Sequence, residues 1–245
     1  MGRKDKNWIM KRKRDPYYRL AKKLKYRSRA YFKLLQINEK FHFLKPKQAV
    51  LDLGCAPGGW MEAAKEIVGD QGLIVGIDLQ KVKPFKDKNL IPIQGDFTKE
   101  RNLKKIKEIL RERGREKFDV VISDASPNIS GHWAVDHARS VELVKTALQI
   151  ATEMLRKDGH FVAKVFYGDM VDELKNLAKK YFDKVYLTKP RASRKESSEI
   201  YLIAKRFKGK SWEEEDRIER DIKKEEDEEL LIKKIKRMKE CSNMQ

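Results

Sequence analysis

Short apolar runs alternate with longer amphipathic segments from residue 48 to residue 207, and this alternation constrains the fold more than any other feature. Strands that are separated by helices along a chain pair in parallel and are buried on both faces. The pattern predicts strands over residues 48–54, 72–79, 90–97, 118–124, 160–166, 184–190 and 198–207, and helices over 58–68, 102–114, 134–159 and 169–182. We therefore expect an α/β protein with helices on both faces of a mostly parallel sheet.

The two ends of this region depart from strict alternation. Only a loop separates the last two predicted strands, 184–190 and 198–207, so we expect them to form an antiparallel pair at one edge of the sheet. Before the first strand, Ser28 is a suitable N-cap for a helix that runs to about Phe41. Gly159 is expected to end the longest helix.

Composition divides the chain into a basic arm over residues 1–27, the alternating domain over 28–207, and a tail over 208–245 that is dense in both charges. The arm carries 12 Lys or Arg against two acidic residues, with Trp8 and three tyrosines among them. Cations contact phosphates and aromatic rings stack on bases, so the arm and the net charge of +19 predict a nucleic-acid partner. The tail is expected to be a solvated helix or disordered.

The apolar runs and the cysteines of the sequence indicate in which compartment the protein is expected. There is no run of 18 apolar residues and no apolar stretch behind the basic N-terminus, so we expect neither a membrane span nor a secretory signal. The two cysteines, Cys55 and Cys241, form neither a metal-binding spacing nor a disulfide framework, which fits a reducing cytosol. The prediction is a cytoplasmic protein without a bound metal, and a monomer is the default expectation.

Residues 54–59 read GCAPGG and follow the first predicted strand, where ligands of open α/β sheets bind. A dinucleotide favours GxGxxG with backbone amides directed at a pyrophosphate, whereas Pro57 removes one amide from this loop. Asp78 and Asp96 end the next two strands, where carboxylates can bind a ribose or lie near an adenine. The layout favours S-adenosyl-L-methionine (SAM), which has no phosphate, over NAD; a tight turn without a ligand is the alternative.

Four ionic residues at separate places in the sequence can meet near this loop. Lys164 lies inside the apolar run 160–166, where a lysine is costly unless it is paired or extends to the surface. Asp124 follows a predicted strand, which alone is more typical of a turn, and Glu199 opens the last strand. Lys33 lies on the first helix. Together they offer two lysines and two carboxylates at one edge of the sheet.

Six motifs between residues 24 and 207 form a specific set: YRSRAYFKL, LDLGCAPGGW, GDF, SDASPNISG, AKVF and KPRASRKESSEIY. With these motifs the chain resembles the FtsJ/RrmJ family of RNA ribose 2′-O-methyltransferases, also called RlmE. The resemblance implies a Rossmann-like SAM-dependent methyltransferase fold. It also implies a catalytic tetrad at Lys33, Asp124, Lys164 and Glu199, and cofactor contacts at Gly58, Trp60, Asp78, Asp96 and Asp124. Ser126 departs from the family pattern, which has alanine there.

The resemblance implies methyl transfer to a ribose 2′-hydroxyl, with Lys164 facing the hydroxyl either as a neutral base or as a charged positioning group. The expected substrate is a uridine of large-subunit ribosomal RNA, presented in single-stranded or loop RNA. A tRNA anticodon loop, or a non-catalytic role as an RNA-binding ribosome-assembly factor, are the alternatives. Arg191, Arg194 and Lys195 are expected to bind phosphates beside the target nucleotide.

Overall fold

The computed structural model describes residues 14–213 and divides the chain into two units, residues 1–209 and 210–245. The expectations for Trp8, for the rest of residues 1–13 and for the charged tail from residue 214 onward lie outside the described residues. The architecture below is that of the first unit.

A seven-stranded mixed sheet forms the centre of this unit, in the order β3-β2-β1-β4-β5-β7-β6. Its strands are β1 (Ala49–Leu53), β2 (Leu73–Asp78), β3 (Leu90–Gln94), β4 (Phe118–Ser123), β5 (Leu155–Phe166), β6 (Phe182–Thr188) and β7 (Glu199–Phe207). The first five strands pair in parallel, and β7 is antiparallel to both of its neighbours. The predicted α/β class and the antiparallel last pair are confirmed, although β7 lies one position inside the edge and β6 forms the edge.

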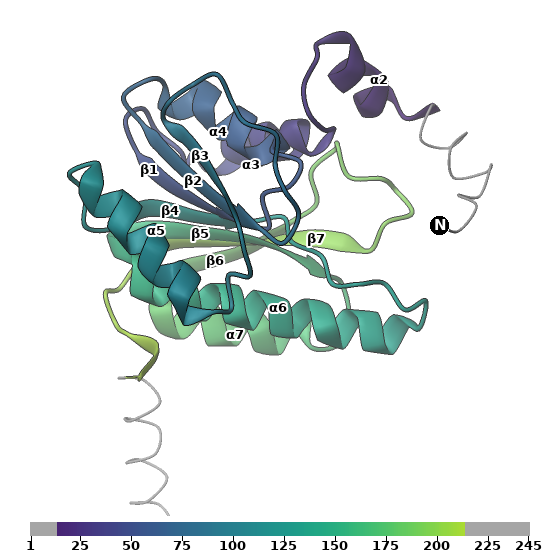
Figure 1. Cartoon of the computed structure of the whole chain (residues 1–245). Helices are drawn as coiled ribbons and strands as arrows, with labels where there is room; N and C mark the ends of the chain where they lie inside the picture. The colour runs from purple at the N-terminus through teal and green to yellow at the C-terminus, as the bar shows by residue number, and fades with distance from the viewer. Residues whose placement is uncertain (1–13, 214–245) are drawn as a thin grey trace, which may run out of the picture. The chain divides into compact units, whose positions relative to one another are not determined.

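Helices cover both faces of the sheet, with α3 and α4 on one face and α5, α6 and α7 on the other (Figure 1). The helices are α2 (Pro16–Lys23), α3 (Ala30–Phe41), α4 (Gly59–Val68), α5 (Glu100–Glu112), α6 (Trp133–Met154) and α7 (Val171–Tyr181). Apolar side chains with at most 1% exposure fill the layer between α3, α4 and the sheet, among them Leu34, Ile37, Met61, Ile122 and Val162. Each such burial stabilises the fold by about 2 kcal/mol. None of the helices between residues 14 and 213 combines the length and the apolar composition needed to cross a membrane.

The prediction that Gly159 ends the longest helix is wrong. Helix α6 already ends at Met154, and β5 follows without a loop. Within β5 the pairing with β4 shifts in register, and a Cβ atom at Gly159 would lie only 3.0 Å from the carbonyl oxygen of Asp119 and 2.8 Å from that of Arg156. Gly159 therefore permits a close approach of two backbones inside the sheet, which is a second common role of glycine in strands.

The N-terminal helices also differ from the prediction. Helix α3 begins at Ala30 with Arg29 in the N-cap position and without a side-chain capping bond, so Ser28 is not its cap. Helix α2 lies inside the predicted basic arm and was not expected. The Asp15 carboxylate caps it with a 3.1 Å bond to a backbone N–H, and Pro16 occupies its first turn. An aspartate followed by a proline is a known start signal for helices.

The ring of His160 on β5 should make the stability of the fold dependent on pH. Burial and the nearby Lys205 lower the pKa of His160 to about 4, from 6.5 in an unfolded chain. The unfolded state therefore binds the proton more tightly, so stability that is fully present above pH 6.5 is lost as the pH falls toward 4. We expect a loss of about 2 kcal/mol, less than the full shift implies because the ring is partly exposed.

Urea unfolding at pH 7 and pH 4 measures this effect in the wild-type protein and in His160→Gln. Glutamine does not titrate, so the difference in unfolding free energy between the two pH values should be about 2 kcal/mol smaller in the variant. Identical pH dependence in both proteins would contradict the assignment to His160.

Candidate active site and cofactor pocket

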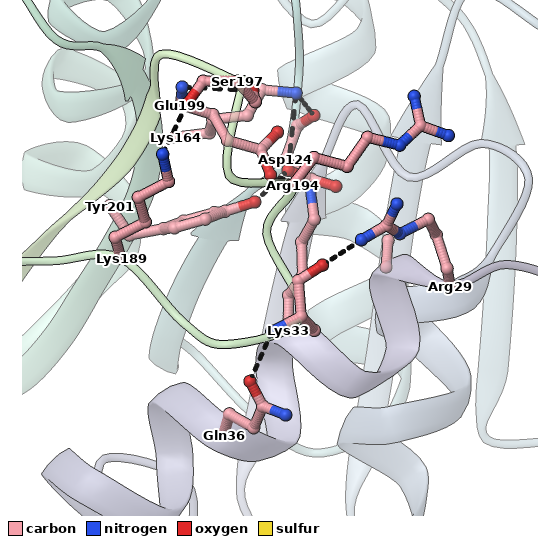
Figure 2. A network of polar contacts seen from close by, with 12 residues as sticks. Arg29, Lys33, Gln36, Asp124, Lys164, Lys189, Arg194, Ser197, Glu199 and Tyr201 are labelled. Atoms are coloured by element: carbon pink, nitrogen blue, oxygen red, sulfur yellow. Dashed lines mark hydrogen bonds and ion pairs between the residues drawn. The ribbon is translucent and has the colours of Figure 1, made fainter. Parts of the chain in front are cut away.

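Two lysine–carboxylate pairs lie next to each other where β4 and β5 end and β7 begins (Figure 2). The Nζ atom of Lys164 donates a 2.8 Å bond to the backbone oxygen of Asp124 and lies 3.4 Å from its carboxylate oxygen Oδ1. Lys33 of α3 lies 2.7 Å from Oε1 of Glu199. All four side chains are less than a fifth exposed. The structure thus brings the four predicted residues together as two partly buried ion pairs.

Tyr201 lies between the two pairs and was missed by the sequence analysis. It is opposite Lys164 in the β5–β7 ladder, and its hydroxyl donates a 2.8 Å bond to Oδ1 of Asp124. The Nζ atom of Lys33 lies 5.7 Å from the centre of its ring. Burial and the charge of Asp124 raise the pKa of Tyr201 well above its usual value, so its hydroxyl stays a donor. The available signal was the two-residue spacing from Glu199, which places both side chains on one face of a strand.

The surroundings of Asp124 keep its carboxylate charged. Burial alone, the largest single influence, would raise its pKa, whereas the positive charges of Lys164 and Lys33 lower it. Hydrogen bonds from Tyr201 and Lys164 act in the same direction, and the pKa of Asp124 lies below its usual value. The site therefore presents a charged carboxylate beside a lysine, an arrangement that can orient a polar group brought next to it.

The glycine loop after β1 lies against the segment that follows β4. Gly54 has a φ of +79°, and a Cβ atom there would lie 2.6 Å from the Cβ of Ala125, so only glycine fits this position. Gly58, in the N-cap position of α4, has a φ of +109°. A pocket of about 140 Å³ opens beside the loop, and Asp124 and Trp60 are among its lining residues. The absence of side chains at Gly54 and Gly58 thus permits close packing within the protein beside this pocket.

Asp78 and Asp96 lie at the predicted edge of the sheet, where Asp78 binds the glycine loop as well as its own loop and Asp96 binds its own loop. The two carboxylate oxygens of Asp78 accept bonds of 2.9 Å from the amide of Ala56 and 2.7 Å from that of Gln80. Oδ1 of Asp96 accepts bonds from the hydroxyl and the amide of Thr98, and these bonds lower the pKa of Asp96. A carboxylate has about four acceptor positions, so both retain capacity to bind a ligand.

Trp60 is a core residue that also reaches the pocket. Its side chain is buried, its indole Nε1 donates a 2.9 Å bond to the carbonyl of Ala30, and its ring centre lies 5.7 Å from that of Tyr201. The indole therefore joins α4 to α3 beside the two ion pairs. Packing accounts for a tryptophan at this position, and a cofactor contact through the pocket stays a prediction.

Arg27 connects the glycine loop to the loop after β2, and the sequence analysis did not predict this role. Its guanidinium lies 3.5 Å above the ring centre of Phe85. It donates bonds of 2.5 Å and 2.8 Å to the carbonyls of Lys83 and Pro84, and a longer bond of 3.4 Å to that of Pro57. A single side chain thus holds two of the loops that meet at the carboxyl edge of the sheet.

Comparison with known proteins identifies the family. The family model of FtsJ-like methyltransferases matches residues 26–207. Ribosomal RNA large subunit methyltransferase E of Methanocaldococcus jannaschii is 67% identical over 244 residues, which is 99% of each chain. The protein of the same name from Methanothermobacter thermautotrophicus is 48% identical over 209 residues, which is 85% of this chain and 97% of the relative. A crystal structure from Plasmodium falciparum, described as a ribosomal RNA methyltransferase, has a TM-score of 0.66 and 32% identity, and covers 76% of this chain and all of that one. As its motifs predicted, the chain belongs to the FtsJ-like methyltransferase family.

Proposed function

We propose that this protein transfers a methyl group from SAM to a ribose 2′-hydroxyl, on a uridine of large-subunit ribosomal RNA. The observation that carries this proposal is the grouping of Lys33, Asp124, Lys164 and Glu199 around Tyr201, beside the pocket of the glycine loop. A hydroxyl nucleophile must be oriented and must lose its proton, and paired lysines and carboxylates are suited to both tasks. The names of the relatives support the substrate class.

The chemistry of the pocket residues fits SAM, which supplies a methyl group on a positively charged sulfur. Ser28 Oγ and Arg29 Nε are buried without a hydrogen-bond partner among the described residues, and both residues line the pocket. These donors would bind the cofactor's carboxylate. Asp78 would accept hydrogen bonds from its ribose, and Asp96 would lie near its adenine. The charged carboxylate of Asp124 would favour a cationic cofactor over its neutral product.

Lys164 would face the 2′-hydroxyl during the transfer. In this transfer the 2′-oxygen would bond to the methyl carbon, the bond from that carbon to sulfur would break with its electron pair left on sulfur, and the hydroxyl proton would pass to solvent water. The hydrogen-bond and ion-pair partners of Lys164 among the described residues are oxygen atoms of Asp124, so its Nζ acts as a donor at this site. We therefore assign to Lys164 the role of holding the 2′-oxygen and stabilising the negative charge that develops on it. Lys33 and Glu199 would complete the polar wall of this site.

Methyl transfer to defined RNAs tests the function. The purified protein is incubated with methyl-labelled SAM and with ribosomal RNA, assembled large subunits or tRNA, each from cells that lack the relevant modification. We expect label in large-subunit RNA or in the subunit, at a uridine whose 3′ linkage resists alkaline hydrolysis. The Lys164→Ala protein provides the background. Label confined to tRNA, or label on a base, would overturn the proposed substrate.

A further inference from the structure

A groove of about 650 Å³ lies between the start of α2 and the loop that joins β6 to β7. Its lining includes the cations Arg14, Arg191 and Lys195, which have no ion-pair partner in the described part of the chain. Arg29 lines this groove and also lines the cofactor pocket, so the groove and the pocket adjoin at this residue. An RNA strand whose target ribose lies at the ion pairs would therefore continue along this groove.

The buried carboxylate of Asp15 binds two arginines where the groove adjoins the cofactor pocket. The side chain of Asp15 is 6% exposed and forms ion pairs with Arg29 and, at 3.2 Å, with the Nε of Arg194. The same carboxylate caps α2. Burial and the nearby Arg194 lower the pKa of Arg29, which reflects how close the two guanidinium groups lie. Asp15 thus counters the repulsion between two cations from different elements.

A second connection holds the same elements independently of Asp15. The side-chain amide of Gln36 on α3 donates a 3.1 Å bond to the hydroxyl of Tyr17 and accepts a 2.8 Å bond from the backbone N–H of Ala192 (Figure 2 shows Gln36 below the loop). Arg29 also donates to the carbonyl of Ala192. Helix α2 and the loop therefore stay attached to α3 when the charge of Asp15 is removed.

We propose that Asp15 is a positioning residue for the RNA substrate, holding Arg194 so that it binds a phosphate beside the target nucleotide. The proposal rests on the proposed function. Arg194 uses its Nε for Asp15, and its terminal nitrogens have no hydrogen-bond or ion-pair partner among residues 14–213. Its side chain is 40% exposed, so these nitrogens are accessible from the groove. A guanidinium fixed at one nitrogen is prepared for bidentate binding of a phosphate through the others.

Charge alone predicts the opposite role for Asp15. Removing a negative charge from a groove that binds a polyanion should strengthen binding. Glu196 provides the matched comparison, because it lines the same groove, is exposed, and has no ion-pair partner in the described chain. If Asp15 positions Arg194, its neutralisation weakens RNA binding, whereas neutralisation of Glu196 does not.

The experiment compares Asp15→Asn with Glu196→Gln in the full-length protein. Asparagine is as good an N-cap as aspartate, so α2 keeps its cap. For Asp15→Asn we expect the KM for ribosomal RNA and the Kd of a labelled fragment carrying the target site to rise about tenfold. The kcat at saturating RNA and saturating SAM should change by less than about twofold. Glu196→Gln should bind RNA as tightly as the wild type or more tightly.

Tighter or unchanged binding by Asp15→Asn would overturn the proposal, since the carboxylate would then compete with the phosphate or play no part. A double-mutant cycle with Arg194→Ala adds a second criterion: the Asp15→Asn change should have little effect once Arg194 is absent, and additive effects would show that Asp15 does not act through Arg194. Wild-type protein that binds the RNA without methylating it would count against the proposed function and leave the comparison of binding intact. Wild-type protein that does not bind would overturn both.

Discussion

Lys164→Ala is expected to lower the single-turnover rate of methyl transfer by about 10³-fold and to change the affinity for SAM by less than about threefold. The side chain contacts Asp124 through a 2.8 Å bond to its carbonyl and a 3.4 Å approach to its carboxylate, at the mouth of the cofactor pocket. Alanine removes the group that would hold the 2′-oxygen, while the glycine loop stays in place. A loss that appears only in the transition state lowers kcat rather than cofactor binding.

Lys205→Ala is the matched control for this prediction. Lys205 is also a lysine in a strand, its ammonium donates a 2.6 Å bond to the carbonyl of Phe41, and it pairs with His160 at the far end of the same β5–β7 ladder. Its replacement should leave the rate of methyl transfer within about threefold of the wild type. If Lys164→Ala loses SAM affinity as strongly as it loses rate, Lys164 is structural and the assigned role is wrong.

The dependence of the rate on pH separates the two roles of Lys164. A lysine that only positions the hydroxyl gives a single-turnover rate that stays flat from pH 7 to about pH 9, because its side chain accepts no proton in the step. A neutral base gives a rate that rises tenfold per pH unit below its pKa. We expect the flat profile, and a rise with unit slope would assign general-base catalysis to Lys164.

Periodicity alone was sufficient to predict most of the fold. All seven strands of the sheet were predicted, and the most continuous apolar runs belong to strands such as β1 and β2, which are buried on both faces. The boundary at Met154 could not be predicted, since Gly159 stops a helix as readily as it permits two strands to approach. Asp15 and Pro16 are the sequence signal for the start of α2, but the cations and tyrosines around them are equally typical of a nucleic-acid-binding arm.

The positions of the site residues could be predicted from the sequence where these residues lie at the ends of strands. Asp124 and Lys164 follow from the strands that carry them, because parallel strands present their carboxyl ends at one edge. The roles of Tyr201 and Asp15 depend instead on the register of β7 against β5 and on contacts between α2, α3 and a loop. A local sequence pattern does not encode contacts between distant segments, so these contacts are known only from the structure.

Asp124→Asn is expected to weaken SAM binding about tenfold and, in addition, to lower the single-turnover rate at saturating SAM by about 10²-fold. Asparagine keeps the shape of the side chain and can still accept the hydrogen bond from Tyr201. It removes the negative charge beside Lys164 and beside the pocket for a cationic cofactor. The neutral product, S-adenosylhomocysteine, should lose less affinity than SAM, since only the substrate carries the sulfonium charge.

Asp119→Asn on the same strand is the control that separates this effect from a loss of stability. Asp119 lies at the opposite end of β4, where its carboxylate accepts a 2.7 Å bond from the amide of Ala49 and a 2.6 Å bond from Arg156. Its neutralisation should lower the unfolding free energy by about 1 kcal/mol and leave the affinity for SAM unchanged. Calorimetric titration with SAM and with S-adenosylhomocysteine measures both variants. Equal losses for the two ligands in Asp124→Asn would mean that the carboxylate acts through the shape of the pocket, because a purely electrostatic contact must distinguish a charged sulfur from a neutral one.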